Sequence, residues 1–167
     1  MWLRLGVAFG QSYRRAGPVL LCSHRGVDVW ERETALARTT VAWGSVSTVA
    51  GLAVAAATQS PFWRSFGLQT AGWGAVDLGV AVVGRRLQER RMRQLTDPYA
   101  PDAQERELQK LRKVLLINVV ADVGYVALGA VLARHDRPHV AGSGVAIIVQ
   151  GAFLLVHDSV HAAGAHP

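Results

Sequence analysis

The stretch VLLINVVADVGYVALGAVLA, residues 114–133, decides the fold class of this chain. It contains one charged residue, Asp122, and no lysine or arginine. A helix of about 20 residues rises ~30 Å, which is the thickness of the hydrocarbon core of a bilayer. A soluble helix of this length needs a charged face toward water, and a single aspartate does not supply one. The stretch is therefore predicted to span a membrane.

Three further stretches repeat this composition, at residues 39–59, 66–84 and 142–162. Together the four stretches hold three of the 12 Asp and Glu residues (Asp77, Asp122 and Asp158) and none of the 18 Lys and Arg residues. This segregation of charge argues against a soluble enzyme or a disordered tail, and the single cysteine, Cys22, argues against a disulfide scaffold. The predicted fold class is all-α: an integral membrane four-helix bundle that runs up-down-up-down.

The segments outside the four spans complete the predicted organisation. Residues 1–26 have interrupted apolar runs and are expected to form a loosely ordered N-terminal arm rather than a signal peptide. Residues 28–38 are predicted to form a short amphipathic helix before the first span. Residues 27–162 are then one four-span transmembrane domain, and residues 163–167 are a tail. Within the connection 85–113, Asp102 followed by Glu105 resembles a capping box and predicts a helix start.

The distribution of basic residues predicts an orientation. Six of the 18 Lys and Arg residues lie in 1–38 and nine lie in 85–113. The positive-inside rule then places both termini and the 85–113 connection in the cytoplasm. The net charge of +6 is explained by this bias, so nucleic-acid binding is not expected in the absence of a recognition motif. The expected partner is the lipid bilayer, with a second copy of the chain or another membrane protein as a further candidate.

Polar side chains inside the spans mark the candidate site, because each is costly in lipid unless the bundle satisfies it. At ~1.5 Å per residue from the predicted cytoplasmic ends, one polar layer lies ~6 to 12 Å inside the membrane and a second lies deeper. The first layer contains Ser47, Asp77, Asn118, Asp122 and Asp158, and the second contains Tyr125 and Gln150. Helical spacing places Trp73 on the face of Asp77, and His157 and His161 on the face of Gln150. We expect all these residues to face the interior of the bundle.

The same residues resemble a family of small, largely uncharacterised bacterial four-helix membrane proteins. The matching residues are Trp43, Trp73, Asp77, Asn118, Asp122, Tyr125, Gln150, Gly151, Phe153 and Asp158, and the resemblance covers roughly residues 31–162. The chain departs from the family pattern at Ser47, Gly74 and Asp77, where the pattern has asparagine. The resemblance implies the fold, a shared polar core and a multi-pass location in the bacterial inner (plasma) membrane. It implies no activity.

Several interpretations of the polar layer stay open. It is a structural layer if its interhelical hydrogen bonds, worth ~0.6 kcal/mol each, simply hold the bundle together. Three ionised carboxylates in one layer would repel each other, so we expect Asp77, Asp122 and Asp158 to share protons, as in a proton-coupled transporter or channel subunit. His157 and His161, four residues apart, are weak candidates for a metal or haem site. Ser47 and His157 could serve as the nucleophile and base of a hydrolase, but the sequence motif that surrounds such a nucleophile is absent.

The sequence thus predicts a non-enzymatic membrane protein with a structural, interaction or small-molecule-binding role and no cofactor. Transport through the three acids is the alternative, and metal or haem binding is a further one.

Overall fold

The structure, a computed structural model, describes residues 28–165 and contains four long helices. They are α1 (Val29–Ala57), α2 (Pro61–Gln94), α3 (Pro101–Ala133) and α4 (Pro138–Gly164). Within the described residues there is no strand, so the predicted all-α class is confirmed. The predicted N-terminal arm, 1–26, and Cys22 lie outside the described residues.

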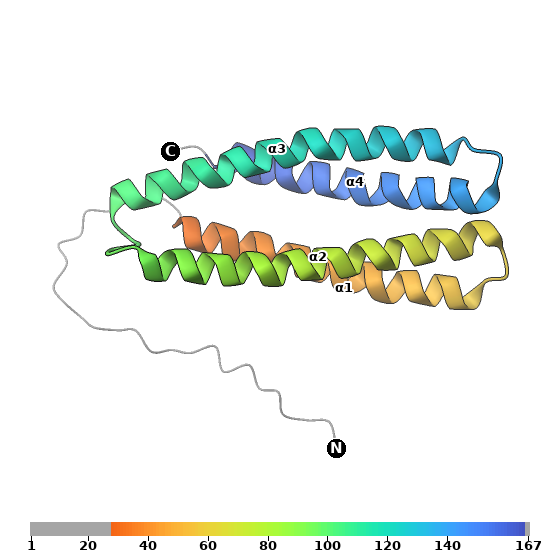
Figure 1. Cartoon of the computed structure of the whole chain (residues 1–167), viewed down its shortest axis with the longest axis horizontal. Helices are drawn as coiled ribbons and strands as arrows, with labels where there is room; N and C mark the ends of the chain where they lie inside the picture. The colour runs from red at the N-terminus through yellow and green to blue at the C-terminus, as the bar shows by residue number, and fades with distance from the viewer. Residues whose placement is uncertain (1–27, 166–167) are drawn as a thin grey trace, which may run out of the picture.

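The helices run antiparallel as two hairpins, α1 with α2 and α3 with α4 (Figure 1). Both hairpin turns lie at one end of the bundle. The α2–α3 connection, the start of α1 and the end of α4 lie at the other, which we call the basic end. The two hairpins join mainly where α2 packs on α4. The up-down-up-down order is therefore confirmed, with α2 and α4 as the central pair.

The helix starts follow local chemistry. Pro61, Pro101 and Pro138 each stand at a first helical position, where the missing N–H costs no hydrogen bond. The Asp28 carboxylate accepts from the N–H of Trp30 and caps α1.

Two predictions about the helix starts were wrong. Residues 28–38 do not form a separate short helix, because α1 runs from Val29 to Ala57 with no glycine or proline to break it before the span. The helix after the connection is not capped by Asp102: it starts at Pro101, and Asp102 pairs with Arg106 at 2.7 Å instead.

Glycines let the two helices of each hairpin approach closely. A Cβ atom added to Gly51 would lie 2.5 Å from the carbonyl oxygen of Gly67, and one added to Gly74 would lie 2.6 Å from that of Gly44. In the second hairpin, a Cβ on Gly129 would lie 2.9 Å from the carbonyl oxygen of Gly144. Such small-residue contacts are typical of helices packed in lipid.

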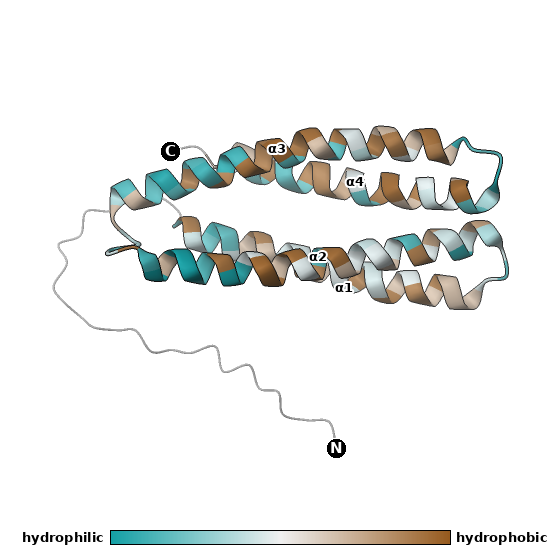
Figure 2. Cartoon of the chain, in the orientation of Figure 1, coloured by the Kyte–Doolittle hydropathy of each residue, from teal (hydrophilic) through white to brown (hydrophobic). Residues whose placement is uncertain are grey.

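The outer surface of the bundle is apolar over most of its length. Many large aliphatic side chains are more than half exposed, among them Val49, Val80, Val120, Val131 and Val156. Figure 2 shows hydrophobic residues along all four helices and hydrophilic residues concentrated at the basic end. All four helices are long and apolar enough to cross a membrane.

Candidate functional site

A chain of hydrogen bonds joins three helices in the middle of the bundle. The Gln150 side-chain amide on α4 donates to Asp77 Oδ2 on α2, and its oxygen accepts from Trp43 Nε1 on α1 at 2.9 Å. Asp77 and Gln150 are both buried. Gln150 therefore links the two hairpins by using both ends of its amide.

The packing glycines hold Asp77 in place. Gly44 and Gly74 lie on either side of the contact between α1 and α2, and a Cβ on Gly44 would lie 3.1 Å from the Cβ of Asp77. Ser47 is buried on the same face of α1, one turn beyond Gly44. Close packing of the two backbones thus positions the Cβ of Asp77, and Gln150 binds its carboxylate.

A column of rings runs along α4 toward the basic end. The Trp43 ring stacks on Phe153 with centroids 3.9 Å apart, and Phe153 stacks on His157 at 5.5 Å. His157 lies 4.7 Å from the tilted ring of His161. The Nδ1 atom of His157 lies 3.0 Å from Asp158 Oδ1, and both residues are buried.

We call Asp77, Asp122, Gln150, His157 and Asp158 the buried polar cluster. Each is buried, and His157 and Asp158 lie within electrostatic range of both Asp77 and Asp122. The cluster draws on α2, α3 and α4, as the spacing of these residues predicts. It contains three carboxyl groups and one imidazole, and the spans that surround it contain no lysine or arginine.

Three polar atoms around the cluster have no hydrogen-bond partner among residues 28–165. They are Asp122 Oδ2, His157 Nε2 and Trp73 Nε1. Asp122 is only 4 % exposed and His157 only 8 %. Nearly all buried polar side-chain atoms in native proteins are hydrogen-bonded to protein or water, so these three unpaired atoms are unusual.

The structure corrects part of the predicted polar layer. Asn118 is exposed on the outside of α3, contrary to the prediction that it faces the interior. Tyr125 is 38 % exposed and meets Trp73 edge-on, with centroids 5.2 Å apart. Both residues flank the buried face of α3, which is centred on Leu115, Asp122 and Gly129. Trp73 is half-buried beside them.

The predicted metal candidates do not form a ligand set. Within the part of the chain that the structure describes, no three His, Cys, Asp or Glu residues come together as they would around a metal ion. His161 is half-buried, toward the basic end from His157.

The sequence analysis missed an ion network at the basic end. Arg91 on α2 donates to both carboxylate oxygens of Glu33 on α1, at 2.6 and 2.8 Å, and its Nε lies 3.2 Å from Glu107 on α3. Lys110 adds a second contact to Glu107 at 2.6 Å. Burial raises the pKa of Glu33, assisted by the nearby Glu107 charge and opposed by Arg91. No periodicity within one helix predicts this network, because its members come from three helices.

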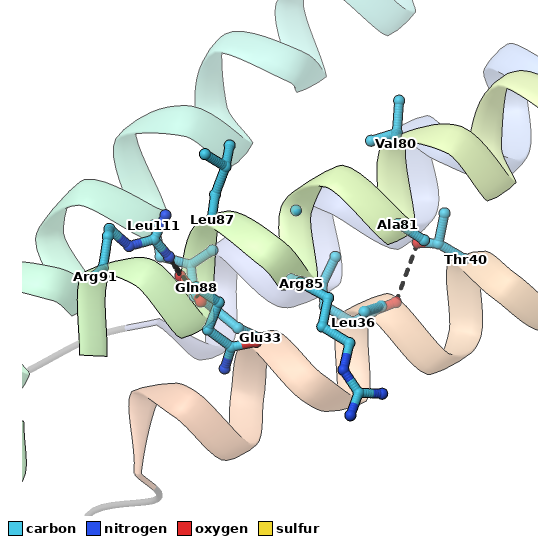
Figure 3. Close-up of a pocket in the computed structure, with 12 residues that line it drawn as sticks. Glu33, Leu36, Thr40, Val80, Ala81, Arg85, Leu87, Gln88, Arg91 and Leu111 are labelled. Atoms are coloured by element: carbon cyan, nitrogen blue, oxygen red, sulfur yellow. Dashed lines mark hydrogen bonds and ion pairs between the residues drawn. The ribbon is translucent and has the colours of Figure 1, made fainter. Parts of the chain in front are cut away.

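Beside this network lies a cavity of about 200 Å³ between α1, α2 and α3. Leu36, Val80, Leu87 and Leu111 give it apolar walls, and Glu33 and Arg91 close it (Figure 3). Ala81 in its wall is one helical turn from Asp77, so the cavity lies next to the buried polar cluster on the side of the basic end.

Comparison with known proteins gives a family and no function. No curated protein and no solved structure matches the chain. A family of unknown function, DUF6992, matches residues 39–159, a range that includes every member of the buried polar cluster and leaves out Glu33. Because the match covers well over half of the sequence, the chain belongs to the DUF6992 family.

Proposed function

We propose that this chain is a multi-pass membrane protein, with one membrane span within each of α1 to α4 and the basic end in the cytoplasm. The apolar outer surface and the four long apolar helices support this proposal. The strong excess of arginine and lysine at the basic end supports the orientation.

Cysteine labelling in intact cells tests the proposed membrane location and orientation. In a Cys22→Ser background, single cysteines replace Ser60 and Asp136 in the two hairpin turns and Thr96 in the α2–α3 connection. A membrane-impermeant maleimide is expected to label the first two and to label Thr96→Cys only after the membrane is opened. Labelling of Thr96→Cys in intact cells would contradict the orientation, and recovery of the protein in the soluble fraction would contradict the spans.

Within this frame, the buried polar cluster binds a small cation. The observation that carries this proposal is the unpaired Oδ2 of Asp122, a nearly fully buried carboxylate oxygen. A layer that served only to hold the helices together is expected to satisfy its own polar atoms. The cluster is rich in carboxyl groups, and the predicted membrane stretches 39–59, 66–84, 114–133 and 142–162 contain no lysine or arginine, so the proposed partner is a bound cation.

The space beside the cluster favours the smallest such species. The cavity between Trp73, Tyr125, Gln150 and Gly151 has a volume of about 10 Å³, room for one water molecule at most. A proton needs no more room than this and fits without any movement of the helices. This size limit favours proton-coupled transport as the wider role, whereas an organic amine needs the bundle to open.

The fluorescence of Trp43 can report on proton binding by the buried polar cluster. Its ring is bonded to Gln150 and stacked on the column that ends at His157, so a change of charge in the cluster alters its surroundings. We expect Trp43 emission, isolated by subtracting the Trp43→Phe variant, to change between about pH 8 and about pH 5. The change should be strongly reduced in Asp122→Asn and unaltered in Asp136→Asn, which removes an exposed carboxylate.

Two outcomes would contradict proton binding. Emission that is independent of pH in the wild-type protein would mean that the cluster holds no exchangeable proton. A response of equal size in Asp122→Asn would mean that the unpaired carboxylate takes no part in it, and the structural interpretation of the layer would then hold.

A further inference from the structure

A second hollow lies on the face of the α1–α2 hairpin. It is a groove of about 520 Å³ between the two helices, close to the basic end. We call it the hairpin groove. Its walls include Arg38, Val41 and Ala42 from α1, and Ala81, Val82 and Arg85 from α2. No residue of α3 or α4 lines it, so it opens outward from the bundle.

The polarity of the hairpin groove changes along its length. Arg38 and Arg85 stand near the middle of its length, and from there to the cytoplasmic end the groove is lined by Thr34, Gln88, Glu89 and Met92; we call this outer half the rim. Ala42 lies one turn, about 6 Å, further into the bundle than Arg38, and Val82 lies about 4.5 Å further than Arg85. Val41 and Val82 are 41 % and 50 % exposed, so the apolar part of the groove faces outward. The order of charged rim and apolar floor is that of a lipid headgroup above its acyl chain.

The charge at the rim favours an anionic headgroup. Arg38 lies on α1 and Arg85 on α2, so each helix contributes one arginine to the lining of the groove. Glu89 shares the rim, and its Oε1 lies 3.3 Å from Arg85 Nε. The rim holds two arginines and one glutamate, so its lining is basic on balance and suits the negative charge of a phosphodiester. In Figure 3 the Arg85 guanidinium points away from Arg91 and Glu33, so it belongs to the rim rather than to the ion network.

We propose that the hairpin groove binds one anionic phospholipid of the cytoplasmic leaflet, with its phosphate at Arg38 and Arg85 and one acyl chain along Ala42 and Val82. This inference rests on the proposed membrane location. Basic pockets between spanning helices on the cytoplasmic side are a recurrent form of anionic-lipid site. The small side chains Ala37, Ala42 and Ala81 provide the room for a chain.

Native mass spectrometry of the purified full-length protein tests this proposal. The protein is equilibrated in detergent with equal amounts of phosphatidylglycerol and phosphatidylcholine, and the retained lipid is counted. We expect one phosphatidylglycerol per chain for the wild-type protein. The Arg38→Ala/Arg85→Ala variant should retain it about 25-fold less, since each of the two basic residues near the surface contributes a factor of about five.

A matched control separates a site from diffuse attraction. Arg86→Ala/Arg93→Ala removes two exposed charges from the same end, and neither residue lines the hairpin groove. We expect this control to retain phosphatidylglycerol nearly as well as the wild-type protein. An Ala42→Leu variant, which keeps all charges but fills the floor of the groove, should lower retention of either lipid at this position.

Equal losses in the two arginine pairs would overturn the site and leave only diffuse attraction to anionic lipid. A change from dimer to monomer in Ala42→Leu would also overturn it, because the occupant of the groove would then be a second copy of the chain. Failure of the membrane location is recognised separately, since the protein would then be recovered in the soluble fraction.

Discussion

Replacement of Gly74 by alanine is expected to loosen the α1–α2 hairpin. A Cβ atom at Gly74 would lie 2.6 Å from the carbonyl oxygen of Gly44, 2.6 Å from Thr48 Oγ1 and 2.7 Å from the Thr48 nitrogen. Ordinary van der Waals contact begins near 3.4 Å, so α1 and α2 must separate locally by about 0.8 Å. Two of the three obstacles are backbone atoms, and no change of rotamer removes them.

The cost of this separation follows from the packing. Overfilling a tightly packed contact destabilises a protein by roughly 1 to 3 kcal/mol. The same movement displaces Asp77, which is one turn from Gly74, and so weakens its bond with Gln150. We therefore expect Gly74→Ala to lower the free energy of unfolding by about 2 to 3 kcal/mol.

The chain offers matched controls for this prediction on the same helix. A Cβ atom at Gly72 or Gly79 would meet nothing within 4 Å among the described residues. Alanine at these positions costs no packing and is favoured over glycine in a helix by up to about 1 kcal/mol. The assay is reversible unfolding of the purified protein in mixed micelles, followed by circular dichroism. If Gly74→Ala unfolds no more readily than Gly72→Ala, the close approach of α1 and α2 is not a source of stability.

Three further perturbations test the polar contacts. Burial raises the pKa of Glu33, so its contribution to stability is complete below the ordinary glutamate pKa and is lost as the pH rises through the higher native pKa. The Glu33→Gln variant should therefore flatten the acid side of the plot of melting temperature against pH. The Glu31→Gln variant, at an exposed position, should leave it unchanged. Arg91→Ala removes the partner that Glu33 and Glu107 share. It should lower the free energy of unfolding by denaturant by about 1 to 3 kcal/mol, a range that allows for the partial exposure of the arginine. An equal loss in Arg93→Ala would argue against the network. Gln150→Leu removes the bonds to Trp43 and Asp77 and should cost about 1 to 2 kcal/mol by the same measure; unchanged stability would mean that the two hairpins are joined by packing alone.

The sequence predicted the parts of the fold that depend on composition and on periodicity within one helix. Long windows without lysine or arginine located the helices, and proline marked three of their starts. Helical spacing also placed Asp77, Asp122, Gln150 and Asp158 on inward faces, because a buried face recurs every seven residues whichever helix covers it.

The misplacement of Asn118 shows the limit of that reasoning. At ~100° per residue, Asn118 lies about 60° from Leu115 around α3, at the edge of the buried face. Whether such an edge is covered depends on how closely the next helix approaches. Here α3 packs mainly on α4, and the side of α3 that carries Asn118 is left exposed.

Contacts between helices were out of reach for a different reason. The pairing of Arg91 with Glu33 and Glu107 depends on the register of three helices, which is set by the turns and by the glycine contacts. Trp43 illustrates the same limit: its four-residue spacing from Ser47 indicates a shared helix face, but its bond to Gln150 depends on how the two hairpins dock.

The central claim is that the buried polar cluster holds a proton that exchanges with the cytoplasm. Infrared difference spectroscopy of the protein in lipid, between alkaline and acidic buffer, measures this most directly through the carboxyl C=O stretch. The account predicts a band from a carboxyl group shielded from bulk water, present in the wild-type protein and in Asp136→Asn and missing in Asp122→Asn. A spectrum in which Asp122→Asn and the wild-type protein show the same bands would contradict it.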